Sequence, residues 1–284
     1  MARILIAGCG YAGSALGHIL AGEGHEVWGL CRRPERLPAS IRPLGADLTD
    51  PATLRSLPSD LEAVFYTTGP DGRGEEAYRA AYVTGLSNLI EALRSQGQQP
   101  RRLIFTSSTS VYPQSNGEWV DEDSPVSPEP FGRGLLLEGE HLCRESPFPG
   151  VVLRLAGIYG PGRASIVESV RKGEALISEG PPRYTNRIHR DDCAGALRHL
   201  MALERPGGLY IGADHEPADR REVIRWLAGE LGAPLPRTGP QEAGRRRAAG
   251  SKRCSNARLL ASGYRFRHPT YREGYAAIIE ERRD

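Results

Sequence analysis

Three glycines near the start of the chain have the spacing of a turn that binds phosphate. Gly8, Gly10 and Gly13 form a G-x-G-x-x-G pattern, with Tyr11 and Ala12 between the last two. In such a turn the first glycine allows a tight bend, the second lets a diphosphate approach the backbone, and the third lets a helix pack on a strand. The N–H groups at the start of that helix then bind the phosphates. The pattern therefore predicts a dinucleotide site.

The residues around this turn provide the context that the motif requires. The apolar run Arg3–Ala7 ends at a glycine and predicts a strand buried in a parallel sheet. Apolar residues recur at helical spacing over Ala12–Leu20, and a second strand is predicted at Glu26–Cys31. Together these elements predict one right-handed β-turn-α-β unit. An ordinary glycine-rich turn is the alternative interpretation.

The residues after the second predicted strand bear on the choice of dinucleotide. Arg32 and Arg33 stand there, and no carboxylate occurs before Glu35. An acidic side chain at this place would bind the ribose 2′-hydroxyl of NAD, whereas arginine accommodates the 2′-phosphate of NADP. Two guanidinium groups suit a phosphate, so we predict NADP as the cofactor. The alternative is a pair of solvated surface arginines.

Predicted strands and helices continue to alternate along the chain. Further strands are predicted at Ala63–Thr67, Arg102–Thr106, Gly150–Leu155 and Gly208–Gly212. Further helices are predicted at Asp50–Leu57, Glu75–Arg94, Gly132–Arg144, Asp191–Leu203 and Tyr271–Arg282, with another from an Asp219 N-cap to Leu231. This alternation predicts an α/β fold, a doubly wound parallel-sheet Rossmann domain with a smaller C-terminal substrate lobe.

We expect the following domain boundaries. Residues 1–155 would form the NADP-binding Rossmann domain, and residues 189–212 would rejoin it. Residues 156–188 and 213–284 would form the smaller substrate-binding lobe.

The composition excludes several functional classes. A formal net charge of +2 over 284 residues gives no electrostatic reason to expect nucleic acid or an anionic membrane as partner. The five cysteines are never spaced as C-x-x-C, which argues for a reducing compartment and against a zinc site, so no metal is predicted. No apolar run reaches the ~18 residues of a spanning helix. We therefore expect a cytoplasmic protein with a small-molecule substrate.

Several further motifs, in the same order along the whole chain, resemble the extended short-chain dehydrogenase/reductase family, which contains the nucleotide-sugar epimerases and dehydratases. The matching segments are Gly45–Asp50 (GADLTD), Ile104–Tyr112 (IFTSSTSVY), Leu153–Gly162 (LRLAGIYGPG), Arg187–Asp192 (RIHRDD) and Ser255–Leu259 (SNARL). The resemblance implies that Asp47 and Leu48 flank the adenine. It also implies cofactor contacts from residues that follow two later strands: Thr67, Thr68, Gly69 and Ser107.

The family's chemistry rests on a serine or threonine, a Tyr-x-x-x-Lys pair and an asparagine. Ser108 occupies the serine position, but Phe131 and Leu135 stand where the tyrosine and lysine are expected, and Tyr82 replaces the asparagine. No Tyr-x-x-x-Lys sequence occurs anywhere in the chain. The chain thus resembles an atypical branch that keeps the cofactor site without the standard tetrad.

Two residues are candidate substitutes for the missing proton donor. Tyr82 is one, because the asparagine position faces the active site in the family; the alternative is that it packs between helices. His189 is the other, because its ordinary pKa lies near neutrality; the alternative is a structural histidine. The remaining candidates for substrate binding are Arg133, Tyr159, Asn186 and Arg187.

The cluster Arg245–Arg247, with Arg253 and Arg258 nearby, is a weaker candidate for binding a phosphorylated substrate, and a solvated basic loop is the alternative. We expect an NADP(H)-dependent oxidoreductase that acts on a small carbonyl, imine or sugar-like substrate with a non-standard proton donor. The alternatives are a cofactor-retaining epimerase or dehydratase, and a catalytically silent NADP(H)-binding sensor or interaction protein. The resemblance also implies a homodimer, formed through the helices near 75–95 and 132–145.

Overall fold

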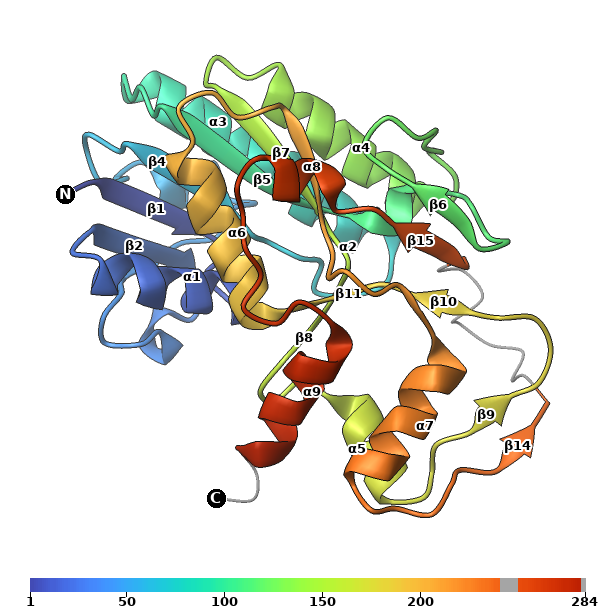
Figure 1. The fold of residues 1–284 in the computed structure, drawn as a ribbon. Helices are drawn as coiled ribbons and strands as arrows, with labels where there is room; N and C mark the ends of the chain where they lie inside the picture. The colour runs from blue at the N-terminus through green and yellow to red at the C-terminus, as the bar shows by residue number, and fades with distance from the viewer. Residues whose placement is uncertain (241–249, 282–284) are drawn as a thin grey trace. The chain divides into compact units, whose positions relative to one another are not determined.

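The computed structural model describes residues 1–240 and 250–281 (Figure 1). The chain divides into two compact units. The first unit comprises Met1–Val111, Val126–Arg154 and Cys193–Tyr210. The second unit comprises Tyr112–Pro125, Leu155–Asp192 and Ile211–Asp284. The Arg245–Arg247 cluster lies outside the described residues.

A seven-stranded sheet has the order β12-β7-β5-β4-β1-β2-β3. Its strands are β1 (Arg3–Ala7), β2 (Glu26–Cys31), β3 (Arg42–Gly45), β4 (Ala63–Tyr66), β5 (Arg102–Ser108), β7 (Gly150–Leu155) and β12 (Leu209–Gly212). The pairs β1–β2, β2–β3, β1–β4 and β4–β5 are parallel. The order reverses between β1 and β4, and ligands of such sheets bind outside the carboxyl ends of the strands at that point.

Helices cover both faces of this sheet (Figure 1). On one face lie α1 (Tyr11–Gly22) and α6 (Arg190–Ala202); on the other lie α2 (Glu75–Arg79), a π-helical turn η3 (Ala80–Thr84), α3 (Gly85–Ser95) and α4 (Phe131–Arg144). Short 3-10 turns occur at η1 (Pro34–Arg36), η2 (Pro51–Leu54) and η4 (Thr109–Val111). Leu5 and Tyr66 share a buried core with Leu86 and Leu89 of α3. Because both faces are covered, β1 is apolar at consecutive positions.

The predicted α/β fold is confirmed, with local differences. The helix expected at Glu75–Arg94 is interrupted by the π-helical turn η3. The helix expected at Asp50–Leu57 is only the 3-10 turn Pro51–Leu54. Strand β3 was not predicted, because it is an exposed edge strand whose sequence, Arg-Pro-Leu-Gly, has no apolar run. Proline is tolerated at such an edge since no further strand needs its missing N–H.

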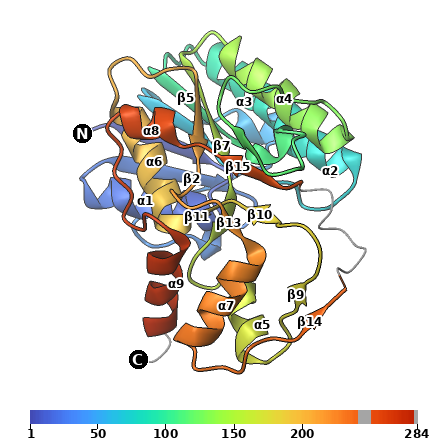
Figure 2. The same cartoon turned by 45° about the vertical axis from the view of Figure 1, so that its right-hand side comes forward.

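The second unit consists of short strand pairs and small helices (Figure 2). The pairs are β6 (Glu118–Val120) with β15 (Lys252–Cys254), β8 (Gly157–Tyr159) with β11 (Arg187–His189), β9 (Ile177–Ser178) with β14 (Thr238–Gly239), and β10 (Tyr184–Thr185) with β13 (Ala218–Asp219). The helices are α5 (Ser165–Arg171), α7 (Arg220–Glu230), α8 (Ala257–Ala261) and α9 (Tyr271–Glu280).

The apolar core of the second unit joins α5, α7 and α9 through residues such as Val167, Ile224 and Ile278. Helix α7 begins as predicted, since the Asp219 carboxylate accepts a hydrogen bond from the N–H of Arg221. Within the described part of the chain, no helix is both long and apolar enough to span a bilayer.

Candidate functional site

Gly8 forms a tight turn at the carboxyl end of β1. Its φ of +80° lies in the left-handed region that favours glycine. A Cβ on Gly8 would lie only 2.2 Å from the Thr68 hydroxyl oxygen. The N–H groups of Gly8 and Cys9 both donate to the Leu30 carbonyl of β2, at 2.9 and 3.2 Å. Position 8 therefore has no room for a side chain, and its backbone conformation also favours glycine.

The other two glycines of the motif differ in what surrounds them. A Cβ on Gly13 would lie 2.8 Å from the Thr67 hydroxyl and 3.0 Å from Ile6, so α1 packs closely against the sheet at this point. A Cβ on Gly10 would meet no atom nearer than the Gly8 carbonyl oxygen at 3.8 Å. The space beside Gly10 is thus open at the start of α1.

The first turn of α1 suits an anion. Gly10 is the N-cap, followed by Tyr11 and Ala12, and no side chain among the described residues caps the helix there. The first turn contains no acidic residue. The positive end of the helix dipole therefore faces the open space beside Gly10. Open space beside Gly10 and the positive end of a helix are the features expected of a phosphate-binding turn.

The segment after β4 lies directly beside the glycine turn. The Thr67 N–H donates to the Ala7 carbonyl at 2.8 Å, and its hydroxyl donates to the Gly8 carbonyl at 2.9 Å. The Thr68 hydroxyl reaches the Ala7 carbonyl at 3.5 Å. At Gly69, a Cβ would meet nothing within 4 Å. The structure thus brings Thr67, Thr68 and Gly69 to the edge of the sheet where its strand order reverses.

The residues predicted to bind the adenosine end follow β2 and β3. Arg32 forms an ion pair with Asp71, and Arg33 is exposed without an ion-pair partner in the described part of the chain. The Asp47 carboxylate accepts hydrogen bonds from the N–H and hydroxyl of Thr49 at 2.9 and 2.7 Å. These bonds, together with nearby Arg32, lower the pKa of Asp47.

Leu48 and Asp71 lie in the segments that follow β3 and β4. Leu48 is buried, and its carbonyl accepts a hydrogen bond from the Asn88 side chain at 2.9 Å. Asp71, the partner of Arg32, was missed by sequence reasoning. It lies 39 residues from Arg32 in the G-P-D-G loop after β4, and no motif marks it.

The two serines at the end of β5 have different surroundings. Ser107 is buried, and its hydroxyl donates to the Glu140 carboxylate at 2.6 Å. Glu140 also forms a buried bidentate ion pair with Arg154, at 2.9 and 2.7 Å. Ser108 is the last residue of β5, and its hydroxyl accepts a hydrogen bond from the Ser110 N–H at 3.1 Å. The Ser107 hydroxyl therefore has a hydrogen-bond partner inside the first unit, while Ser108 lies at the carboxyl end of β5.

Tyr82 belongs to an aromatic row in the first unit. It lies in the π-helical turn η3 and makes edge contacts with Phe105 and Tyr78, at ring distances of 6.3 and 5.7 Å. Phe131, which replaces the family's tyrosine, packs on Tyr78 and is 41% exposed. Burial raises the pKa of Tyr82 to about 12. Tyr82 therefore stays protonated at neutral pH and can donate a hydrogen bond, but it is a weak acid.

The predicted substrate residues lie in both units. Arg133, in α4, donates to the Glu129 carbonyl at 2.8 Å. The Asn186 side chain ties the segment before β11 to β15, donating to the Lys252 carbonyl at 2.9 Å and accepting from the Cys254 N–H at 2.7 Å. The side chain of Asn186 thus already has partners inside the second unit.

Tyr159, Arg187 and His189 are brought together inside the second unit. Strands β8 and β11 pair in parallel, with His189 opposite Tyr159, and the two rings meet edge-on at 5.3 Å. All three residues are buried, with 5%, 7% and 3% of their surfaces exposed. The hydroxyl of Tyr159 and Nε2 of His189 have no hydrogen-bond partner among the described residues.

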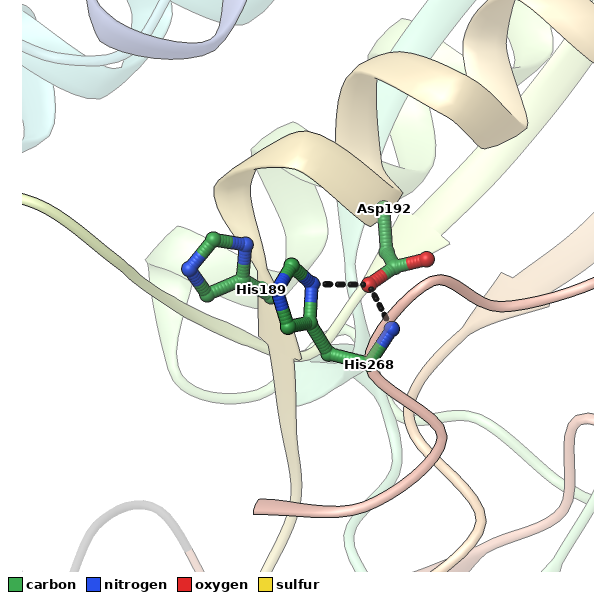
Figure 3. A group of neighbouring side chains, drawn as sticks. All are labelled: His189, Asp192 and His268. Atoms are coloured by element: carbon green, nitrogen blue, oxygen red, sulfur yellow. Dashed lines mark hydrogen bonds and ion pairs between the residues drawn. The ribbon is translucent and has the colours of Figure 1, made fainter. Parts of the chain in front are cut away.

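The ring of His189 contacts that of His268 beside Asp192 (Figure 3), with the ring centroids 3.9 Å apart and the planes tilted by 42°. One Asp192 oxygen accepts hydrogen bonds from the Tyr264 hydroxyl at 3.0 Å and the Arg267 N–H at 2.6 Å. The other accepts from the His268 N–H and its Nδ1, at 2.9 and 3.0 Å. Each Asp192 oxygen thus accepts two hydrogen bonds, all from residues 264–268. These bonds join the start of α6 to the segment before α9. Sequence reasoning missed His268, which no motif marks.

Burial decides the protonation of His189. Its Nδ1 accepts a hydrogen bond from the Asp191 N–H at 3.2 Å. Loss of solvation, followed by the neighbouring His268, lowers the pKa of His189 to about 4. The ring is therefore neutral at pH 7, which disfavours it as a proton donor.

Asp214 gives the second unit a pH-dependent stability. Asp214 is 1% exposed, and one of its carboxylate oxygens has no hydrogen-bond partner among the described residues. Burial raises its pKa from 3.8 to about 8; Arg187 and the hydrogen bond from the Glu216 N–H oppose this rise, and the charges of Glu216 and Asp192 add to it. Because the folded-state pKa is the higher, folded Asp214 keeps a proton that the unfolded chain releases between these two pH values. This group therefore makes the free energy of unfolding fall as pH rises through that window.

We expect Asp214→Asn to remove this contribution. Relative to wild type, the variant should gain up to about 1.4 kcal/mol per pH unit between roughly pH 4 and pH 8. Chemical denaturation of both proteins at several pH values measures the difference. If the free energies of unfolding of the two proteins change in parallel with pH, the pH dependence does not come from Asp214.

Comparisons with known proteins agree with this architecture. The family model of the NAD dependent epimerase/dehydratase family matches residues 4–205. A 3-diazoavenalumate denitrifying reductase from a Streptomyces species is 30% identical over 96% of this chain and 98% of its own. The human epimerase family protein SDR39U1 is 26% identical over 94% of this chain and 96% of its own.

Solved structures agree as well. A proposed NAD-dependent epimerase/dehydratase from Methylobacillus flagellatus is 37% identical, with a TM-score of 0.83 over 100% of this chain and 99% of that one. With the glycine turn in place and phenylalanine and leucine at the tyrosine and lysine positions, the chain belongs to the NAD-dependent epimerase/dehydratase family as an atypical member of the extended short-chain dehydrogenases.

Proposed function

We propose that this protein is an NADP(H)-dependent reductase of a small electrophilic substrate and works without a tyrosine–lysine proton donor. The observation that carries the proposal is the glycine turn at Gly8–Gly13, with open space beside Gly10, in a chain whose tyrosine and lysine positions hold Phe131 and Leu135. The protein has kept the means to bind a hydride donor and has lost the family's acid–base pair.

The cofactor would be held by residues at one edge of the sheet. The first turn of α1 would bind the diphosphate, flanked by Thr67 and Thr68, whose hydroxyls bond to the carbonyls of Gly8 and Ala7. Asp47 and Leu48 would contact the adenine, and Arg33 would contact a 2′-phosphate. The bound nicotinamide would supply a hydride. The solved structure of human SDR39U1 contains NADPH, which supports this choice of cofactor.

The pKa values disfavour a substrate that needs a strong proton donor. Reduction of a carbonyl leaves an alkoxide that must be protonated, and a general acid works best with a pKa near the working pH. Burial raises the pKa of Tyr82 to about 12 and lowers that of His189 to about 4. An iminium or diazonium group already carries positive charge, so a hydride neutralises it without a proton donor. We therefore propose that the substrate is a cationic nitrogen compound, such as an iminium or diazonium ion, rather than a simple carbonyl or sugar-like compound. The 3-diazoavenalumate denitrifying reductase among the relatives supports this preference.

Stoichiometric enzyme and NADPH test the proposal. We expect NADPH absorbance to fall when a cyclic iminium ion or an aryl diazonium ion is added, and to fall more slowly with matched aldehydes and ketones. Gly10→Ala enzyme serves as the background control, since the added methyl group fills the open space at that turn. Tight NADPH binding with no hydride transfer to any substrate would instead identify a silent dinucleotide sensor.

We propose that Tyr82 and Ser108 donate hydrogen bonds to the substrate. Tyr82→Phe keeps the ring that packs on Phe105 and Tyr78 but removes the hydroxyl. Losing one donor to a developing oxyanion lowers kcat by about 10²-fold, whereas an iminium substrate develops no such charge. We expect the loss with carbonyl substrates and a much smaller one with iminium substrates. Equal rates for wild type and variant on both would assign Tyr82 to packing alone.

A further inference from the structure

The ion pair between Arg32 and Asp71 crosses the dinucleotide edge of the sheet. Arg32 follows β2, and Asp71 lies in the loop that follows β4. Strand β1 lies between β2 and β4 in the sheet. Since neighbouring strands are about 4.8 Å apart, β2 and β4 are about 10 Å apart, and the ion pair joins the segments that follow these two strands on either side of β1. The carboxyl end of β1 is where the glycine turn begins, at Gly8.

Arg32 interacts with two carboxylates, those of Asp71 and Asp47. Its guanidinium is paired with the Asp71 carboxylate, and both side chains are more than half exposed, at 57% and 66%. Arg32 also contributes to the lowered pKa of Asp47. A 2′-phosphate that binds Arg32 must therefore compete with a carboxylate already in place, while Arg33 has no ion-pair partner among the described residues.

The Arg32–Asp71 pair can separate at little cost. Both side chains are more than half exposed, and an exposed ion pair contributes little to stability.

We propose that Asp71 is the specificity-determining residue that sets the choice between phosphorylated and unphosphorylated dinucleotides. The inference rests on the dinucleotide site of the proposed function. With a free ribose 2′-hydroxyl, the ion pair stays closed, and the Asp71 carboxylate accepts a hydrogen bond from that hydroxyl. With a 2′-phosphate, the dianion takes over the Arg32 guanidinium and repels Asp71. The protein therefore binds both cofactors, and Asp71 reduces its preference for the phosphorylated one.

Asp71→Asn tests this inference by direct titration with NADPH and NADH, followed by protein fluorescence or calorimetry. Removing one competing carboxylate should tighten NADPH binding by about three- to ten-fold. NADH binding should be unchanged or weaker, so the ratio of the two Kd values changes. In an Arg32→Ala background, Asp71→Asn should favour NADPH much less, because the competition for the guanidinium is gone and only the direct repulsion between Asp71 and the phosphate remains.

Asp60→Asn is the matched control. Asp60 is an exposed carboxylate of the first unit that pairs with Arg3 at 3.4 Å, so the variant makes the same charge change elsewhere. Its Kd ratio should equal that of wild type. If all proteins bind both dinucleotides and Asp71→Asn leaves the ratio unchanged, the inference is overturned while the proposed function stands. If none of them binds either dinucleotide, the proposed function itself fails.

Discussion

Replacing Gly10 with alanine is expected to weaken NADPH binding by about 100-fold or more while leaving the protein folded. The added methyl group meets no atom nearer than 3.8 Å in the protein, and the negative φ of −98° is outside the left-handed region that favours glycine. The ψ of −140° lies outside the usual α and β regions, so alanine adds a strain of about 1–3 kcal/mol. The same methyl group occupies the space through which a diphosphate reaches the N–H groups of α1. Each charge-assisted hydrogen bond contributes about 1.5–3 kcal/mol, so losing two is enough for this effect.

Gly22→Ala is the control for this experiment. Gly22 is also in α1, and a Cβ there would meet nothing within 4 Å. We expect wild-type NADPH affinity and an equal or slightly higher Tm, since alanine favours the helix. Titration with NADPH and thermal unfolding measure both variants. Full NADPH affinity in folded Gly10→Ala would show that the diphosphate binds elsewhere. Gly8→Ala cannot replace this test, because it clashes with Thr68 and strains the backbone.

Replacing Glu140 with alanine is expected to destabilise the protein by about 3–5 kcal/mol. Glu140 and Arg154 are almost fully buried, with 3% and 6% of their side chains exposed. Glu140 also accepts the hydrogen bond from Ser107. Removing the carboxylate leaves a buried guanidinium charge without its counter-ion, at a far higher cost than the value of the pair itself. Chemical denaturation followed by circular dichroism measures the change.

Glu138→Ala is the matched control in the same helix. Glu138 is 46% exposed and pairs with Arg79 at 3.5 Å, so its loss should cost no more than about 1 kcal/mol. Glu140→Gln keeps the shape and one acceptor, and it should fall between the two. Similar losses for Glu138→Ala and Glu140→Ala would mean that water reaches the Glu140–Arg154 pair and screens it.

Local sequence determined the first β-turn-α-β unit almost completely. The constraint on Gly8 is a backbone conformation, and the apolar run of β1 reflects burial on both faces. Both properties depend on near neighbours, so residue type and spacing reveal them. The edge strand β3 escaped prediction because its exposure removes the apolar signal.

The chemistry of the site was only partly contained in the sequence. The absence of Tyr-x-x-x-Lys is visible in the sequence itself and removes the standard acid–base pair. The sequence also displays Arg32 and Tyr82, but not their partners. The Arg32–Asp71 ion pair and the contact of Tyr82 with Phe105 join residues far apart in the chain.

Tertiary structure alone decided the charge state of the remaining candidates. The pairing of β8 with β11 buries His189 against Tyr159, and burial holds the pKa of His189 well below its usual range. The same cause raises the pKa of Asp214, a residue that no motif identified. A pKa depends on the solvent and charges around a group, and folding sets these by bringing distant segments together. The sequence thus determined the glycine turn of the first unit, and the fold decided the protonation of His189 and Asp214 in the second.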